Sequence, residues 1–237
     1  MNNTLKNSLE SLRIQTEGME LSQSLAHLSI LFPGKVTLSS SFSWEDQVLS
    51  HFVLEARLDI EIFTLDTGRL FPETYSVWSK TNERYHAKIK AYYPKDYEVE
   101  QYVSEKGPNA FYNSVADRKA CCFIRKVEPL KRALKNKSIW ITGLRAEHSL
   151  ERNDLQILEW DEGNSIIKYN PLLNTTTDDL KKVIRENNIP YNPLHDKGFV
   201  SIGCAPCTRA ILEGEDFRAG RWWWEENTKK ECGLHAR

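Results

Sequence analysis

Cysteine is the residue type whose spacing carries the strongest chemical signal in this chain of 237 residues. Cys121 and Cys122 are adjacent, Cys204 and Cys207 form a C-x-x-C pair, and Cys232 stands near the carboxyl end. Thiolates bind zinc ions and iron–sulfur clusters. In a reducing compartment, an odd number of cysteines points to metal binding or catalysis more than to structural disulfides. The set therefore divides into four candidate metal ligands and one further thiol.

The adjacent pair favours an iron–sulfur cluster over a single ion. Neighbouring side chains on a helix diverge by roughly 100°, so Cys121 and Cys122 are bridged more easily by a wide [4Fe-4S] cluster than by one tetrahedral zinc ion. The alternative is that one of them is a small buried apolar side chain. Arg125 and Lys126 follow four residues later and could offset the negative charge, although a solvated helix face would also explain them.

The carboxyl-terminal segment combines a thiol with several cations. The lysines at 229–230 favour a thiolate at Cys232, whereas Glu231 opposes it. Arg218 and Arg221 precede them and are suited to contacts with oxyanions. A reactive nucleophile is one interpretation of Cys232, and a free thiol without a function is the other.

Three polar segments follow predicted strands. The serine-rich run at 39–43 precedes a predicted helix, where hydroxyls and backbone N–H groups can hold an anion or simply cap the helix. The segment 65–69 and the segment that opens at Gly143 occupy equivalent positions, at the sheet edge where nucleotides bind in α/β folds. A nucleotide-like anion is therefore expected, and the candidate binding residues are Ser39, Ser40, Ser41, Phe42, Ser43, Leu65, Asp66, Thr67, Gly68, Gly143 and Arg145.

A strand-then-helix alternation must position these residues. Helical leucine spacing predicts two helices in the opening forty residues. We then predict strands over 36–41, 60–65, 87–92 and 138–142, helices over 44–56, 72–85, 117–134 and 177–187, and a hairpin of 155–160 with 165–169. The fold class is α/β, with a mostly parallel twisted sheet flanked by helices.

The domain organisation follows from the same pattern. Residues 1–213 are expected to form one nucleotide-binding domain, with a helical extension over 1–34. Residues 214–237 are expected to form a mobile catalytic tail, which the tryptophans at 222–224 would attach to the body of the domain.

Composition excludes several classes of protein. The 32 Lys and Arg against 33 Asp and Glu leave a formal charge of -1, too balanced for a duplex nucleic-acid binder. No apolar run reaches the length of a membrane span and the first residues lack a signal-peptide pattern, so we expect a cytoplasmic protein without nucleic-acid or membrane partners.

The motifs together resemble the iron–sulfur type of assimilatory phosphosulfate reductases, the adenylyl-sulfate (APS) reductases. The resemblance covers most of the chain, from about Val36 to His235. The matching stretches are SSSFSWED at 39–46, LDTG at 65–68, CCFIRK at 121–126, TGLR at 142–145, YNPLHDKGFVSIGCAPCTR at 191–209, EDFRAGRWWWE at 215–225 and ECGLH at 231–235. This chain departs from the pattern at two places. The arginine loop that opens at Gly143 has His148-Ser149 where relatives commonly have Gln-Ser and is a residue shorter, and Arg118 stands where some relatives have histidine.

The resemblance implies an adenine-nucleotide alpha-hydrolase-like fold and thioredoxin-dependent reduction of APS to sulfite and AMP, within sulfate assimilation and cysteine biosynthesis. A cysteine S-sulfonate would be the intermediate, and thioredoxin or a glutaredoxin-like dithiol would release sulfite from it. By the same likeness, one [4Fe-4S] cluster would be held by Cys121, Cys122, Cys204 and Cys207. Lys126 would lie between cluster and substrate, Cys232 would attack the sulfur, and the phosphosulfate would be surrounded by Arg152, Arg218, Arg221 and His235.

Three alternatives remain at this stage. The 3′-phosphorylated substrate PAPS could be reduced by the same chemistry. A PP-loop ATP pyrophosphatase with a cluster is a second alternative, although the serine run lacks the Gly-Gly of that group. A zinc-bearing binding module without turnover is the third. The oligomeric state is open, a homo-oligomer included.

Overall fold

The computed structural model describes residues 2–148 and 155–225. Its strands form one sheet in the order β3-β2-β1-β4-β6-β5. All neighbouring pairs are parallel except the hairpin of β5 and β6. The strands are β1 (Val36–Ser39), β2 (Ile60–Leu65), β3 (Lys90–Tyr92), β4 (Ile139–Ile141), β5 (Leu158–Asp161) and β6 (Ile166–Tyr169).

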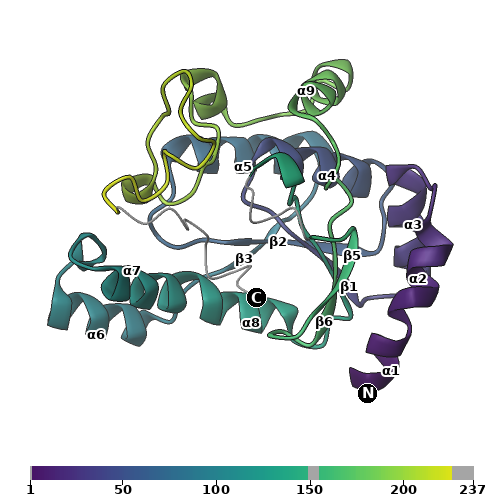
Figure 1. Cartoon of the computed structure of the whole chain (residues 1–237), viewed down its shortest axis with the longest axis horizontal. Helices are drawn as coiled ribbons and strands as arrows, with labels where there is room; N and C mark the ends of the chain where they lie inside the picture. Colours follow the sequence, from purple (N-terminus) through teal and green to yellow (C-terminus); the bar gives the residue numbers. More distant parts are fainter. Residues whose placement is uncertain (1, 149–154, 226–237) are drawn as a thin grey trace.

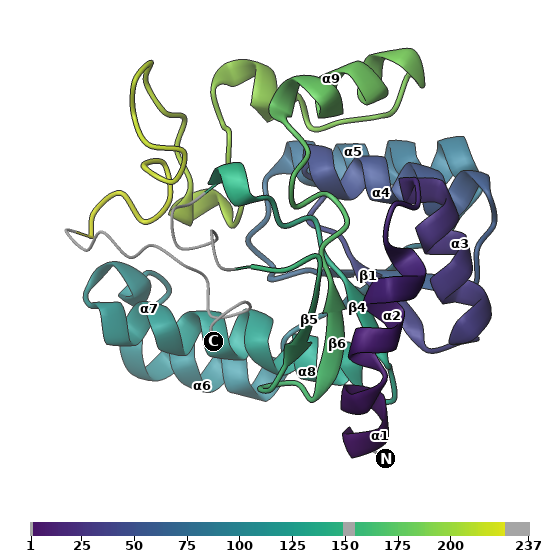
Figure 2. The ribbon, with the colours of Figure 1, turned by 45° about the vertical axis from the view of Figure 1, so that its right-hand side comes forward.

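Helices cover both faces of this sheet (Figure 1). One face carries α4 (Trp44–Glu55) and α5 (Pro72–Tyr85), with α9 (Thr177–Glu186) packed on α4. The other face carries α6 (Asp96–Lys106), α7 (Val115–Cys122) and α8 (Glu128–Leu134). Figure 2 shows α1 (Asn2–Asn7), α2 (Leu9–Thr16) and α3 (Leu21–Leu31) grouped at the β5–β6 side of the sheet. The predicted α/β class with a mostly parallel sheet is confirmed.

The central strands are apolar because both of their faces are covered, as is typical of parallel sheets. Val36 and Leu38 of β1 and Ile139 and Ile141 of β4 have no exposed surface, and all four belong to the main core cluster. Val36 lies in register with Ile139. This buried centre fixes where the strands end, and therefore where the polar segments after them lie.

Two parts of the helical prediction were wrong. The first predicted helix is two helices, α1 and α2, separated at Ser8. Helix α6 was not predicted, because among its residues only Tyr102 is buried and the apolar repeat is correspondingly weak.

The predicted helix over 117–134 contains a π-helical turn at Phe123–Val127, between α7 and α8. The backbone N–H of Glu128 donates to the carbonyl of Phe123, five residues back. Pro129 explains the wider turn, because proline lacks an N–H and its ring clashes with the carbonyl four residues earlier in an α-helix. The turn contains Arg125 and Lys126, and π-turns within helices often occur at functional sites.

Candidate functional site

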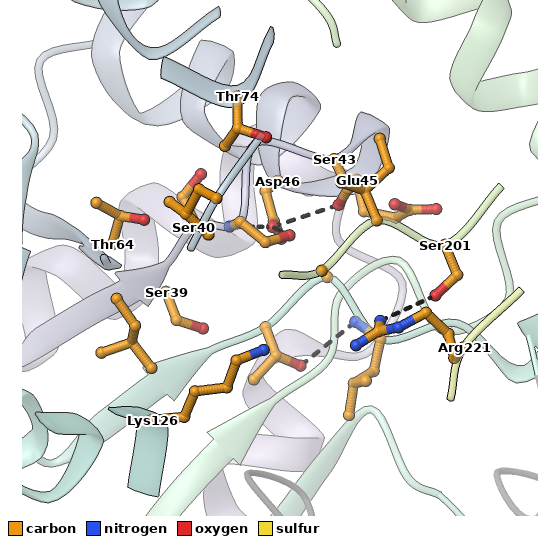
Figure 3. A pocket seen from close by; sticks show the side chains of 18 of the residues that line it. Ser39, Ser40, Ser43, Glu45, Asp46, Thr64, Thr74, Lys126, Ser201 and Arg221 are labelled. Atoms are coloured by element: carbon orange, nitrogen blue, oxygen red, sulfur yellow. Dashed lines mark hydrogen bonds between the residues drawn. The ribbon is translucent and has the colours of Figure 1, made fainter. Parts of the chain in front are cut away.

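A pocket lies at the carboxyl edge of the sheet, beside the ends of β1, β2 and β4 (Figure 3). The chain runs outward from β1 to β3 and then returns to place β4 on the other side of β1. Such a reversal of strand order is where α/β sheets bind ligands. Predicted residues that line the pocket are Ser39, Ser40, Ser41, Ser43, Leu65, Lys126, Gly143, Arg218 and Arg221.

The serine loop is organised by Asp46 at the start of α4. One carboxylate oxygen, Oδ2, accepts hydrogen bonds from the backbone N–H and the hydroxyl of Ser41, both at 2.6 Å, and from the Ser43 hydroxyl at 3.3 Å. Burial raises the pKa of Asp46 to about 6, and the hydrogen bonds from Ser41 partly oppose that rise. The loop is therefore held by an internal carboxylate at the pocket wall.

Phe42 differs from the serines around it. Its φ of 61° is left-handed, its side chain is fully buried, and its ring stacks on Trp78 with centroids 5.6 Å apart. It is absent from the residues that line the pocket. Phe42 thus anchors the loop in the core, and its side chain does not contribute to the pocket wall.

Gly143 allows the segment after β4 to approach α4 closely. A Cβ atom at this position would lie 2.5 Å from Oδ1 of Asp46 and 2.7 Å from Cβ of Glu45, so neither neighbour could stay in place. Glycine is needed here for space and not for a positive φ.

Replacing Gly143 by alanine is therefore expected to displace Asp46 and weaken binding of an adenine nucleotide such as AMP by roughly tenfold or more, since loop distortions of about 1 Å have large effects. Isothermal titration calorimetry measures the change. Gly163→Ala is the matched control, because its added Cβ would make only an ordinary 3.5 Å contact with Asp161. Equal AMP affinity in both variants would contradict the role of the close approach.

Arg145 is buried away from the pocket wall. It has no exposed surface, and its Nε donates to Oε1 of Glu45 at 2.8 Å. Its terminal nitrogens donate to Glu147, the Thr175 carbonyl and the Thr177 hydroxyl. In this arrangement, the guanidinium holds Glu45 and the segment after β4 together. Its predicted contact with substrate stays a prediction.

The segment after β2 connects the pocket to the cysteines. Leu65 lines the pocket, while Asp66 accepts hydrogen bonds from the Gly68 backbone at 2.8 Å and from the Tyr75 hydroxyl at 2.8 Å. The Thr67 hydroxyl lies 3.2 Å from Sγ of Cys204. Only the first part of this segment therefore faces the pocket, and its second part faces the cysteines.

All four predicted metal ligands line one small cavity beside the pocket. Cys121 and Cys122 end α7. Cys204 precedes a 3-10 turn at Ala205–Cys207, and Cys207 is the last residue of that turn. Burial is the main cause that raises the pKa of Cys121, and it raises the pKa of Cys207 to about 12. These shifts favour the neutral thiols, so a thiolate in this cavity would need a positive partner such as a bound metal centre.

The described residues hold no group of three or more His, Cys, Asp or Glu arranged around a single metal ion. The wall that the four cysteines share contains no described His, Asp or Glu, so the candidate donors are all sulfur. An all-cysteine donor set fits a [4Fe-4S] cluster, and it also occurs at zinc sites. The cations in the same wall are Arg69, Arg118, Arg125 and Lys126.

Lys126 lies between the two cavities and lines both. Its neighbour Arg125 is buried and donates from Nη1 to the Thr67 carbonyl at 2.6 Å. Figure 3 shows Lys126 below the serine loop. The π-turn carries Lys126, and its expected place between cluster and substrate stays a prediction.

Arg218 and Arg221 approach from the segment after residue 213. The Cζ atoms of Arg218 and Arg221 lie 5.7 and 4.8 Å from the centroid of the Trp222 ring. Cζ of Arg118 lies 4.5 Å from the same centroid. Nη1 of Arg221 donates to the Ser201 hydroxyl at 3.4 Å, and Gly203 packs directly against its guanidinium. An antiparallel bridge from Thr208 to Arg221 ties this segment to the body.

Trp222 is buried, and Trp224 packs against Phe111 and Tyr112, whereas Trp223 is exposed. Two of the three tryptophans thus attach this segment to the body, as expected. Arg152, Cys232 and His235 lie outside the described residues.

Sequence reasoning missed several pocket residues that lie outside the quoted motifs. They are Thr64, Leu70, Thr74, Leu130 and Trp140. Ser201 lies within the stretch 191–209 but was not named as a site residue. Thr64 and Trp140 lie within β2 and β4, and Thr74 and Leu130 lie within α5 and α8, so a signal based on strand ends could not find them. Thr74 accepts a hydrogen bond of 3.2 Å from Asn192, which belongs to the stretch 191–209. No described helix is long and apolar enough to cross a membrane.

The sequence is similar to those of known phosphosulfate reductases. The family model described as phosphoadenosine phosphosulfate reductase domain matches residues 35–210. Adenosine 5′-phosphosulfate reductase of Allochromatium vinosum is 50% identical over 202 residues, which are 85% of this chain and 79% of that protein. The Sinorhizobium fredii (strain NBRC 101917 / NGR234) protein of the same name is 46% identical over 233 residues, 98% of this chain and 92% of that protein.

A solved structure extends the likeness to three dimensions. The phosphate complex of phosphoadenylyl-sulfate (PAPS) reductase from Candida auris has a TM-score of 0.73 and 26% identity, covering 87% of this chain and 97% of that one. Candida glabrata FMN adenylyltransferase, at a TM-score of 0.52 and 16% identity, shares the fold alone. This chain is an enzyme of the phosphoadenosine phosphosulfate reductase family.

Proposed function

We propose that the enzyme reduces APS to sulfite and AMP, with thioredoxin or a glutaredoxin-like dithiol as the electron donor. One observation carries the proposal: Lys126 belongs to the wall of an anion-suited pocket and to the wall of a cavity with four cysteines. The curated relatives named above, which are adenosine 5′-phosphosulfate reductases, support APS as the substrate.

The charge of the pocket suits a phosphosulfate. Arg221 is only 6% exposed, and its Nε has no hydrogen-bond partner among the described residues. A planar guanidinium can donate in a fork to two oxygens of a phosphate or sulfate group. Arg218 and Lys126 line the same pocket and add positive charge. We place APS here, with its phosphosulfate towards these cations.

The Cys232 thiolate would attack the sulfur of APS. The bond from sulfur to the bridging oxygen breaks, AMP leaves with that electron pair, and Cys232 becomes an S-sulfonate. A donor thiolate then attacks the Cys232 sulfur, sulfite leaves, and a mixed disulfide joins Cys232 to the donor. The second donor thiolate attacks the donor sulfur of that bond, closes a disulfide on the donor and releases the Cys232 thiolate, so the donor supplies two electrons. Lys126, Arg218, Arg221 and His235 would stabilise the charge on the leaving oxygens.

An external donor is needed because the other four cysteines are assigned elsewhere. Cys121, Cys122, Cys204 and Cys207 would hold the [4Fe-4S] cluster, which when bound would supply a fixed charge beside Lys126. We propose that its oxidation state does not change during turnover. The part of the tail beyond Trp224, which carries Cys232, would close over APS and reopen for the donor, a gating role common among enzyme lids.

Replacing Cys204 by serine is expected to reduce bound iron and acid-labile sulfide from about four of each per chain to under half of that, since thiolates hold such clusters. Anaerobic purification followed by iron and sulfide assays measures the loss. Cys232→Ser is the matched control and should keep the full content. Zinc without sulfide in the wild-type protein would contradict the cluster.

The same chemistry on PAPS is the second candidate, favoured by the likeness to the Candida auris enzyme. Sulfite production from APS and from PAPS, assayed side by side with thioredoxin, separates the two. Faster turnover of PAPS would overturn the preference for APS, and conversion of ATP to AMP and pyrophosphate would favour a PP-loop pyrophosphatase. The cytoplasmic location stays a prediction that cell fractionation can test. The oligomeric state is open, and sedimentation can determine it.

A further inference from the structure

The pocket wall contains two adjacent carboxylates, Glu45 and Asp46. This is unexpected in a site for a dianion, since buried like charges repel. Glu45 is balanced by the buried guanidinium of Arg145 at 2.8 Å. Among the described residues, no lysine or arginine lies within ion-pair distance of Asp46, whose partners are hydroxyls and a backbone N–H. Asp46 is therefore the carboxylate that would oppose an incoming anion.

The hydrogen bonds of Asp46 also determine what the serine loop can offer. An ionised carboxylate only accepts, so the Ser41 and Ser43 hydroxyls must point their hydrogens at Oδ2. Each hydroxyl has one hydrogen, and it then presents only lone pairs to the pocket. With Asp46 ionised, these two serines repel the oxygens of a bound anion. A neutral Asp46 would leave both hydrogens free to turn towards the ligand.

We propose that Asp46 takes up a proton from solvent when APS binds, and that this frees the Ser41 and Ser43 hydroxyls to donate to the bound anion. This inference rests on the proposed function. Asp46 would act as a positioning residue, since its proton state decides which way two substrate-facing hydroxyls point. The added proton also removes one negative charge from the pocket as the phosphosulfate enters, and no electrons move.

The surroundings of Asp46 set the direction of the effect. Desolvation by burial is the main cause that raises its pKa to about 6, and Glu45 adds to the rise. A bound dianion raises the pKa further. Binding is then strongest at low pH and weakens as the pH rises from the pKa of the free enzyme through that of the complex. The charged groups around the site are Glu45, Lys126, Arg145, Glu147, Arg218 and Arg221.

Isothermal titration calorimetry with APS, in buffers of different ionisation enthalpy at pH 7.5, counts the protons. The measurement uses Cys232→Ser, to prevent turnover, combined with His235→Asn, because a histidine near the phosphosulfate would itself take up a proton. We expect an uptake of more than one half proton per APS. The dissociation constant should rise by roughly threefold to tenfold per pH unit between pH 6.5 and 7.5.

Two further variants assign the proton. In this background, Asp46→Asn mimics the neutral acid, and we expect no proton uptake and a dissociation constant independent of pH. Glu45→Gln should retain the uptake, and loss of uptake in Glu45→Gln alone would place the proton on Glu45 and overturn the assignment. If circular dichroism shows that Asp46→Asn does not fold, the number of protons taken up by the Cys232→Ser, His235→Asn protein still tests whether APS binding is coupled to proton uptake.

The outcomes separate this inference from the proposed function. APS binding with no proton uptake in the Cys232→Ser, His235→Asn background overturns the inference and leaves the proposed function standing. No APS binding by the wild-type chain overturns both. An uptake that persists unchanged in Asp46→Asn also overturns the inference, because another group must then take up the proton.

Discussion

Replacing Cys232 by serine is expected to lower sulfite release from APS by roughly a thousandfold or more, as removal of a covalent nucleophile does in other enzymes. A serine hydroxyl is almost fully protonated at neutral pH, so it cannot attack sulfur as a thiolate does. Sulfite is measured in single-turnover and steady-state assays with thioredoxin present.

The structure supplies controls for this prediction. The pocket residues and the four-cysteine cavity are formed by residues 39–221, so Cys232→Ser should retain APS affinity within about twofold and its full iron content. A variant that still released sulfite at a tenth of the wild-type rate would contradict the role of this thiol. If the variant no longer bound APS, the loss of sulfite release would indicate a structural effect of the substitution and not the loss of a nucleophile.

Replacing Lys126 by glutamine is expected to lower kcat by roughly a hundredfold, with a smaller change in APS affinity. The reason is that Lys126 lines both the pocket and the cysteine cavity, so its charge can stabilise oxygens that become negative in the transition state. Steady-state kinetics separates kcat from KM, and calorimetry gives the dissociation constant of APS.

Lys131 provides the matched control for Lys126. It lies five residues further along the same helical region and is exposed. Its Nζ lies over the Phe123 ring, 5.8 Å from the ring centroid. Lys131→Gln should leave kcat unchanged. An equal loss in both variants, or a Lys126→Gln variant with unchanged kcat, would contradict a specific role for Lys126.

The sequence predicted well those parts of the fold in which one strong local signal determines the type and the bounds of an element. The run Ile60–Leu65 is mostly apolar because both faces of β2 are covered, and its bounds were predicted correctly to the residue. Pro72 predicted the first turn of α5 for the same kind of local reason. The four cysteines were grouped by residue type and spacing, and the structure brings them to one cavity.

The parts that were missed depend on long-range contacts. The hydrogen bond from Arg145 to Glu45 joins residues that are 100 positions apart in the sequence. The spacing of residues within a motif cannot reveal such a contact. The Phe42 side chain lies within a polar motif, yet packing on Trp78 draws it into the core. The π-turn results from Pro129 within an otherwise helical pattern, where a kink or an end of the helix was equally compatible with the sequence.

Mass spectrometry of the wild-type protein tests the central claim most directly. The protein is incubated with APS while every thiol reductant is withheld, and the peptide that contains Cys232 is then isolated. We predict that this peptide gains the mass of one SO3 group, and that adding thioredoxin removes the gain and releases an equal amount of sulfite. An unmodified Cys232 peptide, or an SO3 group carried by any of the other four cysteines, would contradict the account.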